Sequence, residues 1–280
     1  MISPRNPNAQ LSIQSKSKLR IEFLADDNPL YVLPFFEEFL AGYSAEFSIT
    51  RISLCRPMGK RSRRALLTQL TALYGYPGIL RIIARLGYAK VMGMLPRSRE
   101  ANRYFSLTQL AQAYGIPCER IGNPNDQAFC EALTDRSADI IVSVACPYIL
   151  KSALLATPLL GCINIHHAPL PRYKGMMPTF WQVFHGETRV GVTIHSMNEA
   201  IDEGAGLLQE YMDIQPGESL DHLIKRSKRH GAHCMAVVLK QIQAGQQKPF
   251  PLDTAEATYF TFPTADQMLD FRRRGFRVLS

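Results

Sequence analysis

The sequence predicts an α/β fold in which one domain is built on a mostly parallel, twisted sheet with helices on both faces and a helical insertion. Three observations predict this class. Strand-like and helix-like segments alternate from residue 18 onward, as in a doubly wound sheet. The segment "ADIIVSVA" at 138–145 is continuously apolar, which is typical of a central parallel strand covered on both faces. The length of 280 residues suits one large α/β domain, whose core needs no disulfide.

Apolar runs predict the strands, and helical periodicity predicts the helices between them. The strands are expected at 19–25, 47–55, 118–121, 138–145 and 161–167, and the helices at 30–43, 62–74, 78–95, 106–114, 126–134 and 150–156. Two further strand-like runs, 189–197 and 206–214, surround a turn-rich segment, so we expect an antiparallel hairpin there. A long helix is expected over 219–244, followed by an irregular tail to Ser280.

The chain divides into a loose polar tail at 1–17, a main domain at 18–247 with a basic helical insertion at 57–99, and a C-terminal extension at 248–280. The tail lacks the apolar stretch of a signal peptide, and no apolar run reaches the roughly 20 residues that a membrane span needs. The six cysteines show neither a C-x-x-C pair nor a zinc spacing, so we expect reduced thiols. These features predict a soluble, cytoplasmic protein.

The positive charge is concentrated in the insertion. The chain carries a net charge of +8, and 57–99 holds nine Lys or Arg and no Asp or Glu, which leaves 8 − 9 = −1 for the rest. Three interpretations stay open: solvated helices whose Arg stems cover apolar surface, a patch for an anionic substrate or nucleic acid, and an amphipathic surface for a membrane or an acyl chain. The run "FRRRGFR" at 271–277 is expected to extend any such patch.

The segment "CINIHHAPLPRYKGMMPTFW" at 162–181 is the candidate site. Alternate side chains of a strand share a face, so Asn164 and His166 project together from the expected strand end. The turn of the hairpin, "NEAIDEGA", is expected to bring Asp202 to His166 at the same end of the sheet. The alternative is that this segment is only a packed turn, in which His166 is a core histidine with its hydrogen bonds satisfied.

The other motifs of the sequence do not indicate a cofactor or metal site. No G-x-G-x-x-G follows the first strand, where "LADDNPLY" stands, so a dinucleotide site is unsupported. His195, His185 and His167 lack the spacing of a zinc site, and no metal is expected. His195 is expected to pack or to form hydrogen bonds, and Trp181 to lie in the core.

The string "NIHHAPLPRYKGMMPTFW…GETRVGVTIHSM…IDEGAGLLQ" resembles the formyltransferases that use 10-formyltetrahydrofolate. These enzymes formylate glycinamide ribonucleotide, methionyl-tRNA or nucleotide-linked amino sugars. The resemblance is strong over 138–210 and looser over 18–245. It implies a Rossmann-like formyltransferase fold, with 18–247 as the catalytic domain.

The resemblance also implies roles for single residues. Asn164 and His166 would donate hydrogen bonds to the oxyanion that forms when an amine attacks the formyl carbon, and Asp202 would pair with His166 and help to remove the amine proton. The folate would lie against the loop after 138–145, the Leu-Pro pair and the hairpin turn. The residues expected to contact it are Cys146, Pro147, Tyr148, Ile149, Leu150, Leu170, Pro171, Glu199, Ala200 and Ile201.

Two departures from the family pattern bear on the acceptor. The segment after the first strand lacks a Gly/Ser-rich phosphate loop, and the C-terminal extension is shorter than the barrel domain of methionyl-tRNA formyltransferases. We therefore expect the acceptor to be a primary amine of a small molecule: an amino sugar, an amino acid derivative or a natural-product intermediate. Methionyl-tRNA is the alternative, which keeps nucleic acid as a less favoured partner. Further alternatives are a formyltetrahydrofolate hydrolase and a non-catalytic anion-binding protein. The sequence does not determine the oligomeric state.

Overall fold

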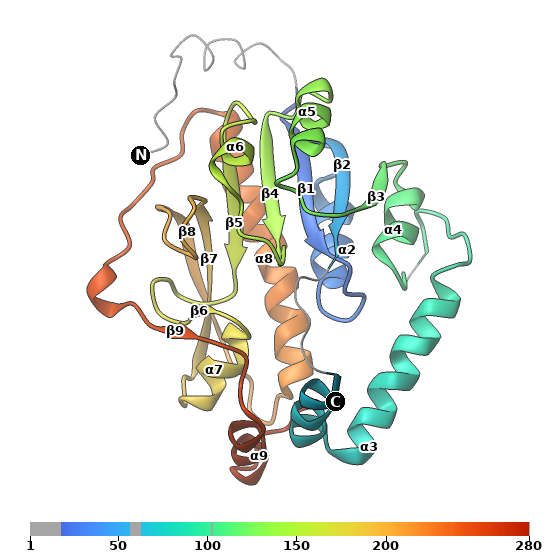
Figure 1. Cartoon of the computed structure of the whole chain (residues 1–280), viewed down its shortest axis with the longest axis vertical. Helices are drawn as coiled ribbons and strands as arrows, with labels where there is room; N and C mark the ends of the chain where they lie inside the picture. The colour runs from blue at the N-terminus through green and yellow to red at the C-terminus, as the bar shows by residue number, and fades with distance from the viewer. Residues whose placement is uncertain (1–17, 57–62, 102, 280) are drawn as a thin grey trace.

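A computed structural model describes residues 18–56, 63–101 and 103–279, so the expected tail at 1–17 lies outside the described residues. Its centre is a seven-stranded sheet with the strand order β3-β2-β1-β4-β5-β7-β8 (Figure 1). The strands are β1 Arg20–Asp26, β2 Ser48–Cys55, β3 Cys118–Ile121, β4 Ile140–Val144, β5 Cys162–His166, β7 Arg189–Ser196 and β8 Gly206–Asp213. The pairs from β3 to β5 are parallel, and β7 and β8 join as an antiparallel hairpin. The α/β class with a mostly parallel sheet is thus confirmed.

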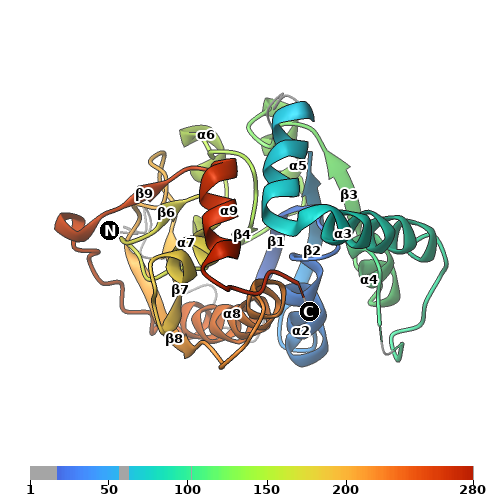
Figure 2. The same cartoon turned by 90° about the horizontal axis from the view of Figure 1, so that it is seen from below.

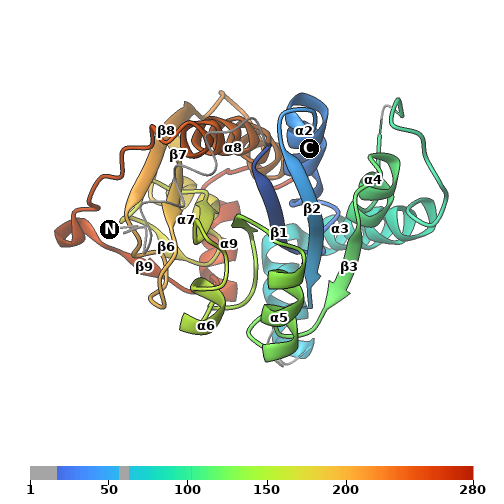
Figure 3. The same ribbon diagram turned by 90° about the horizontal axis from the view of Figure 1, so that it is seen from above.

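Helices cover both faces of the sheet, as Figures 2 and 3 show from the two ends. One face carries α2, α4 and α8, and the other carries α5 and α6. The bounds are α2 Leu33–Tyr43, α4 Leu107–Ala113, α5 Gln127–Asp135, α6 Ser152–Leu155 and α8 Leu220–Gln243. The expected helices all exist, although α2 starts three residues later than expected because the Asn28 carboxamide oxygen accepts from the amides of Leu30 and Tyr31 and holds a turn there.

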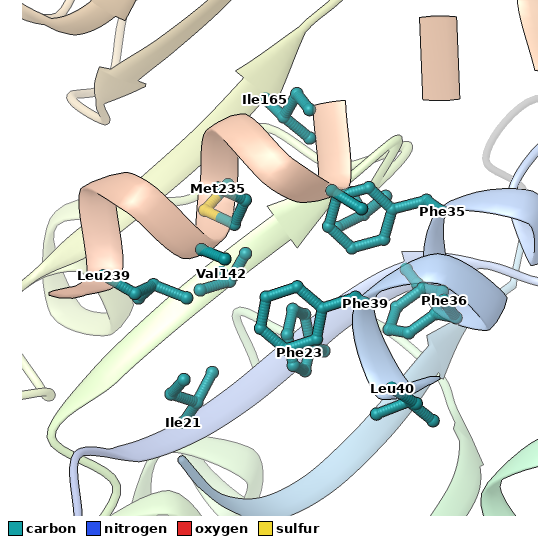
Figure 4. Close-up of a cluster of buried hydrophobic side chains, with 14 of the residues drawn as sticks. Ile21, Phe23, Phe35, Phe36, Phe39, Leu40, Val142, Ile165, Met235 and Leu239 are labelled. Carbon is teal, nitrogen blue, oxygen red and sulfur yellow. The ribbon is translucent and has the colours of Figure 1, made fainter. Parts of the chain in front are cut away.

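The main core lies between the sheet and the layer of α2 and α8 (Figure 4). Phe23 of β1 packs edge-on against Phe36 and Phe39 of α2, at ring-centroid distances of 5.2 and 5.3 Å. Leu24 points to the opposite face, where it packs under α5 and α6. Because both faces of β1 and β4 are buried, both strands are rich in apolar residues and lack the alternation of a half-exposed strand. The buried Glu22 of β1 is the exception, and its carboxylate pairs with Arg136 at 2.7 Å.

The insertion forms one long element, α3 Arg63–Met92, with a kink. Gly75 has a φ of 68°, outside the helical region, which divides α3 into two helical stretches as the sequence predicts. The Tyr74 hydroxyl lies 3.3 Å from that of Tyr31, and Arg85 lies 3.5 Å from Asp221 of α8, so both stretches are tied to the main domain. The basic residues of 57–62 lie outside the described residues.

The prediction of an irregular tail after α8 is wrong in part. The C-terminal segment contains the short strand β9 Tyr259–Phe260, which pairs with β6 Lys174–Gly175, and the helix α9 Ala265–Arg273. Thr264 and Gln267 form a capping box at the start of α9. The segment packs with α3, α7 Pro178–Phe184 and the start of α8 in a second core. A two-residue strand and a helix of nine residues are too short to show a clear period, which explains the error.

Trp181 is buried in this second core, as expected. No helix among the described residues is long and apolar enough to cross a bilayer.

Phe271→Ala tests whether the C-terminal segment is part of the folded core. Phe271 is fully buried and stacks at 4.8 Å on Phe180 of α7, so its truncation should lower the free energy of unfolding by about 3–5 kcal/mol in urea titration. Arg273→Ala, an exposed change on the same helix, should stay within about 0.5 kcal/mol of the parent. Equal stability of the two variants would contradict the packing described.

Candidate functional site

Four polar side chains converge where β5 ends and the β7–β8 turn begins. Asn164 and His166 project from the same face of β5, His195 lies beside them on β7, and Asp202 comes from the turn. The Asn164 amide nitrogen lies 3.1 Å from His195 Nε2, and the two oxygens of Asp202 lie 3.5 Å from His166 Nδ1 and 3.6 Å from His195 Nε2. The expected convergence of Asn164, His166 and Asp202 is therefore present, with His195 as a fourth member.

The bonds of His195 define its tautomer. Its Nδ1 lies 2.8 Å from the Ser196 carbonyl, which can only accept, so Nδ1 carries the proton. Its Nε2 then accepts from the Asn164 amide, which leaves the second N–H of that amide for another partner. Burial lowers the pKa of His195 to about 4 against the attraction of Asp202, so the ring is neutral at pH 7.

His166 is oriented by the loop that follows β5. Its Nε2 donates to the Tyr173 carbonyl at 2.8 Å, which turns Nδ1 toward Asp202. The side chain is largely buried. In the neutral ring Nδ1 has a free lone pair, and in the charged ring it carries an N–H that faces the carboxylate. Nδ1 is therefore the ring atom that can exchange a proton.

Asp202 is held by backbone. Its residue has a φ of 53°, in the left-handed region that Asp tolerates better than most side chains, and its Oδ2 accepts from the Gly175 amide at 3.0 Å. A Cβ at Gly204 would stand 1.6 Å from the Ser196 carbonyl oxygen, so only glycine lets the turn close against β7. The Asp-x-Gly motif thus combines the carboxylate with the close approach that positions it.

The loop after β5 is fixed by the Gly-Val-Thr motif on β7. The Thr193 hydroxyl donates to the Ala168 carbonyl at 2.7 Å and accepts from the Leu170 amide at 3.1 Å. A Cβ at Gly191 would lie 2.5 Å from the Pro169 nitrogen. Gly191 and Thr193 therefore hold this loop against the sheet, the first by its missing side chain and the second by its hydroxyl.

The C-terminal segment holds the other end of the same loop. The Tyr173 amide donates to the Thr258 hydroxyl at 2.8 Å, and β6 pairs with β9. A Cβ at Gly175 would stand 2.3 Å from the Phe260 carbonyl oxygen, so the pairing requires glycine. The groups that orient His166 and Asp202 therefore rest on residues more than 80 positions further along the chain.

The remaining histidines do not join the site. His167 points to the opposite face of β5, as the alternation predicts, and its Nδ1 lies 2.9 Å from Ser227 of α8. Burial holds the pKa of His167 well below its ordinary value. His185 donates to the Trp181 carbonyl at the end of α7. Since His167 and His195 lie on different faces, the three histidines do not gather as a zinc site.

Three side chains of metal-ligand type do converge elsewhere, on β8 and α8. His230 Nε2 lies 3.1 Å from Glu210 and 3.6 Å from the Cys234 sulfur. They are outside the four-residue site, and the expectation that no metal takes part stays a prediction.

The chain is similar to known proteins in both sequence and fold. A family model described as formyl transferase matches residues 98–239, just over half of the chain. The chain belongs to this family. The match includes all four site residues, β4 to β8 and most of α8, but it begins after α3.

Curated relatives include the methionyl-tRNA formyltransferases of Synechococcus sp. strain JA-3-3Ab, 39% identical over 59% of this chain, and of Syntrophus aciditrophicus, 36% identical over 64% of this chain. The aligned part covers 52% and 59% of those proteins, so this formyl transferase chain matches little more than half of their length.

Solved structures share the fold. Glycinamide ribonucleotide transformylase 1 from Symbiobacterium toebii superposes with a TM-score of 0.56 at 16% identity, over 84% of this chain and 95% of that one. The N-formyltransferase from Helicobacter canadensis, solved with folinic acid and dTDP-3-aminofucose, gives a TM-score of 0.55 at 14% identity, over 94% of this chain and 84% of that one. The Rossmann-like formyltransferase fold is thereby confirmed.

The residues expected to contact folate lie on three segments of this formyl transferase, which are the neighbouring loops at 146–150 and 199–201 and the Leu-Pro pair at 170–171. The Glu199 carboxylate accepts from the Ser152 amide at 2.8 Å, which joins the hairpin turn to the start of α6. Ile149 and Ile201 are exposed on these loops, one on each. Leu150 and Leu170 are buried, and their side chains pack inside the protein. The predicted contact of these two residues with folate, like that of their exposed neighbours, stays a prediction.

The expectation that His195 packs or forms hydrogen bonds is confirmed, but its place beside Asn164 and Asp202 was not predicted. The parity of β7 was the available signal, since His195 opposes Asn164 across the strand pair. Two further residues with unusual pKa values were not predicted either. Burial lowers the pKa of Lys228 of α8 to about 7, and burial raises the pKa of its neighbour Asp26 at the end of β1. Neither has a sequence signal, because each becomes unusual only through burial.

The low pKa of His195 predicts a dependence of stability on pH. Between about pH 6.5 and pH 4 the unfolded chain binds a proton at His195 that the folded protein does not, so the free energy of unfolding should decrease as the pH falls through this window. The contribution is at most about 3 kcal/mol. Urea titrations across this range should show a shallower decrease for His195→Gln.

The control is His222→Gln, which changes an exposed histidine of α8. It should follow the parent slope. If His195→Gln and the parent lost stability in parallel, His195 would not be the neutral buried ring described.

Proposed function

We propose that the protein transfers a formyl group from 10-formyltetrahydrofolate to a primary amine of a small molecule, such as an amino sugar, an amino acid derivative or a natural-product intermediate. The observation that carries the proposal is the convergence of Asn164, His166 and Asp202 at the carboxyl end of a central strand. In doubly wound sheets ligands bind at this end. Family membership supports formyl transfer as the reaction.

In the proposed reaction, the amine nitrogen attacks the formyl carbon, the carbonyl oxygen becomes an oxyanion, and the bond from N10 of the folate to that carbon breaks. The Asn164 amide has an N–H that His195 does not use, and this donor would stabilise the oxyanion. The attacking nitrogen loses a proton as the product forms, and N10 gains one. Asp202 with His166 Nδ1 would carry that proton, since 3.5 Å separates the two groups. This role replaces the oxyanion contact expected of His166, because its Nε2 donates to the Tyr173 carbonyl.

The neutral His195 has a supporting role in this scheme. Its unprotonated Nε2 orients the Asn164 amide. Because the His195 ring is neutral, it does not neutralise the negative charge of Asp202. Asp202 therefore remains available to His166 and to the acceptor nitrogen, which must be an unprotonated amine when it attacks. A charged His195 would compete for the same carboxylate.

The donor proposal rests on the two loops that Glu199 joins. Folinic acid is present in the Helicobacter canadensis structure, which shares this fold. The exposed Ile149 and Ile201 would pack against the faces of a pteridine ring, and backbone groups of the two loops would bind its polar edge.

The proposal of a small amine rests on what lies beyond β1. Tyr31 follows β1, and its hydroxyl lies 3.3 Å from that of Tyr74 of α3, while Lys225 and Asp221 of α8 form an ion pair at 2.8 Å nearby. In place of a phosphate-binding loop, these side chains would supply hydroxyls and an ammonium, and the buried Asp221 carboxylate holds that ammonium in position. They suit a compact polar acceptor.

Methionyl-tRNA is the second candidate acceptor. The 39% and 36% identity to methionyl-tRNA formyltransferases favours it, as does the basic insertion. Hydrolysis of formyltetrahydrofolate and anion binding without catalysis remain outcomes of the test.

The test is incubation of the purified protein with 10-formyltetrahydrofolate and a panel of amino sugars, amino acid derivatives and charged methionyl-tRNA, followed by mass spectrometry. A formylated small amine is the expected product. If methionyl-tRNA is the only compound that becomes formylated, it replaces the small amine as the proposed acceptor. Release of tetrahydrofolate and formate without a formylated amine would indicate the hydrolase, and no turnover of folate would contradict the transferase.

Substitutions at the site test the assigned roles. Asn164→Ala should lower kcat about 10²–10³-fold, because it removes an oxyanion donor. Asp202→Asn and His166→Ala should each lower kcat by at least about 10²-fold, because they interrupt proton transfer. Stopped assays with the acceptor found above would measure these rates, and thermal melts would check folding.

Matched controls are His222→Ala and Asp266→Asn, which change the same residue types at exposed positions of α8 and α9. Both should keep the parent kcat. A His166→Ala protein that is folded and transfers formyl at the parental rate would refute the role given to this ring.

A further inference from the structure

The second helical stretch of α3 has an unusually apolar outer surface. Sixteen large apolar side chains are exposed among the described residues, and nine of them lie between positions 67 and 95. The most exposed of these form what we call the α3 ridge. Its members, with their exposed fractions, are Tyr76 at 80%, Leu80 at 69%, Ile83 at 58%, Val91 at 64% and Met94 at 72%.

The ridge is a continuous stripe and not a scatter of single residues. Its four members within α3 follow the spacing i, i+4, i+7 and i+15, which keeps them on one side of an α-helix, and Met94 follows just beyond the end of the helix at Met92. Gly87 lies between Ile83 and Val91 on the same side. The opposite side packs on the protein through Ala89, which is buried, and Arg85, which pairs with Asp221. Figure 1 shows this stretch at the outer edge of the molecule, with no other element over it.

Basic side chains border the ridge. Arg81 and Lys90 flank it on the helix and are exposed, and Arg99 follows it. No Asp or Glu occurs anywhere in 57–99. This combination of exposed apolar and positively charged side chains is not explained by the fold, because soluble proteins seldom leave a contiguous apolar patch without a partner.

The C-terminal segment adds to the positive charge. An open cavity of about 330 Å³ lies between α3 and this segment, and Arg81 and Arg272 both line it. Its other walls are apolar in part, with Leu73, Phe276 and Leu279 among them. Two guanidinium groups over an apolar base form a setting that suits a phosphate attached to an acyl chain.

We propose that the α3 ridge docks this protein on an anionic phospholipid bilayer. The apolar side chains would enter the boundary between headgroups and acyl chains, while Arg81, Lys90 and Arg272 contact headgroup phosphates. No described helix can span a bilayer, so the contact is peripheral.

Charge complementarity favours a bilayer over other occupants. A second copy of this chain would bring like charges of the two ridges together, which costs free energy. A nucleic acid would satisfy the arginines but would cover Leu80, Ile83 and Val91 with polar backbone. An anionic bilayer surface satisfies both kinds of side chain at once.

Docking would also orient the site. The strands β4 and β5 point toward the end of the molecule where α3 and α9 lie (Figure 1). Tyr74, next to the Gly75 kink of the same insertion, reaches Tyr31 beyond β1. The side of the domain that faces an acceptor would therefore lie near the bilayer.

The test is sedimentation of the full chain with vesicles of phosphatidylcholine alone and of phosphatidylcholine mixed with phosphatidylglycerol, at low and high salt. The parent should bind the anionic vesicles at least about tenfold more tightly than the neutral ones, and high salt should weaken this binding. The triple variant Leu80→Ser, Ile83→Ser, Val91→Ser should lose at least about tenfold in affinity for anionic vesicles. Arg81→Gln with Lys90→Gln should reduce the preference for anionic vesicles while leaving the ridge in place.

The matched control is Leu159→Ser, Tyr211→Ser, Val237→Ser, which removes three exposed apolar side chains elsewhere and should bind like the parent. Circular dichroism melts should show that each variant is folded. Equal binding to both vesicle types, or parental binding by the ridge triple, would overturn the proposal. Two other results would also overturn it. The first is light scattering that shows a dimer for the parent and a monomer for the ridge triple variant. The second is binding of the parent to a short RNA duplex without binding to vesicles.

Discussion

The site depends on two backbone groups of one loop. The Tyr173 carbonyl fixes His166 and the Gly175 amide fixes Asp202, at 2.8 and 3.0 Å. Because these groups are two residues apart on one loop, they set the imidazole and the carboxylate next to each other, although the side chains come from a strand end and a distant turn. Any movement of this loop would change both contacts together.

Three glycines make that arrangement sterically feasible, each at a point where two segments meet. Gly191 admits the proline-rich loop to β7, Gly204 admits the hairpin turn to the end of β7, and Gly175 admits β6 to β9. A side chain at any of them would collide with backbone, which cannot move aside as a flexible side chain would. These three glycines thus have a structural role, while the polar residues near them would carry out the proposed reaction.

The protein is organised around one end of its sheet. The parallel strands present their carboxyl ends there, the antiparallel hairpin adds the carboxylate, and the C-terminal segment buttresses the loop between them. The insertion lies at this end as well, tied down through Tyr74 and Arg85, with its apolar stripe outward. The site, its support and the most unusual surface of the molecule therefore belong to the same region.

Local patterns were enough for the sheet and for three members of the site. The continuous apolar run of β4 indicates a strand buried on both faces, and the alternation along β5 places Asn164 and His166 together and turns His167 away. These inferences succeed because a strand has a period of two and covered strands must be apolar, whatever lies around them.

The tertiary structure alone decided the rest. His195 becomes a neutral partner of Asn164 because β7 pairs with β5 and burial disfavours its charge. Lys228 acquires a lowered pKa for the same reason. The role of β9 depends on a contact between segments more than 80 residues apart. Burial, electrostatic environment and long-range pairing are properties of the assembled domain, and no short stretch of sequence contains them.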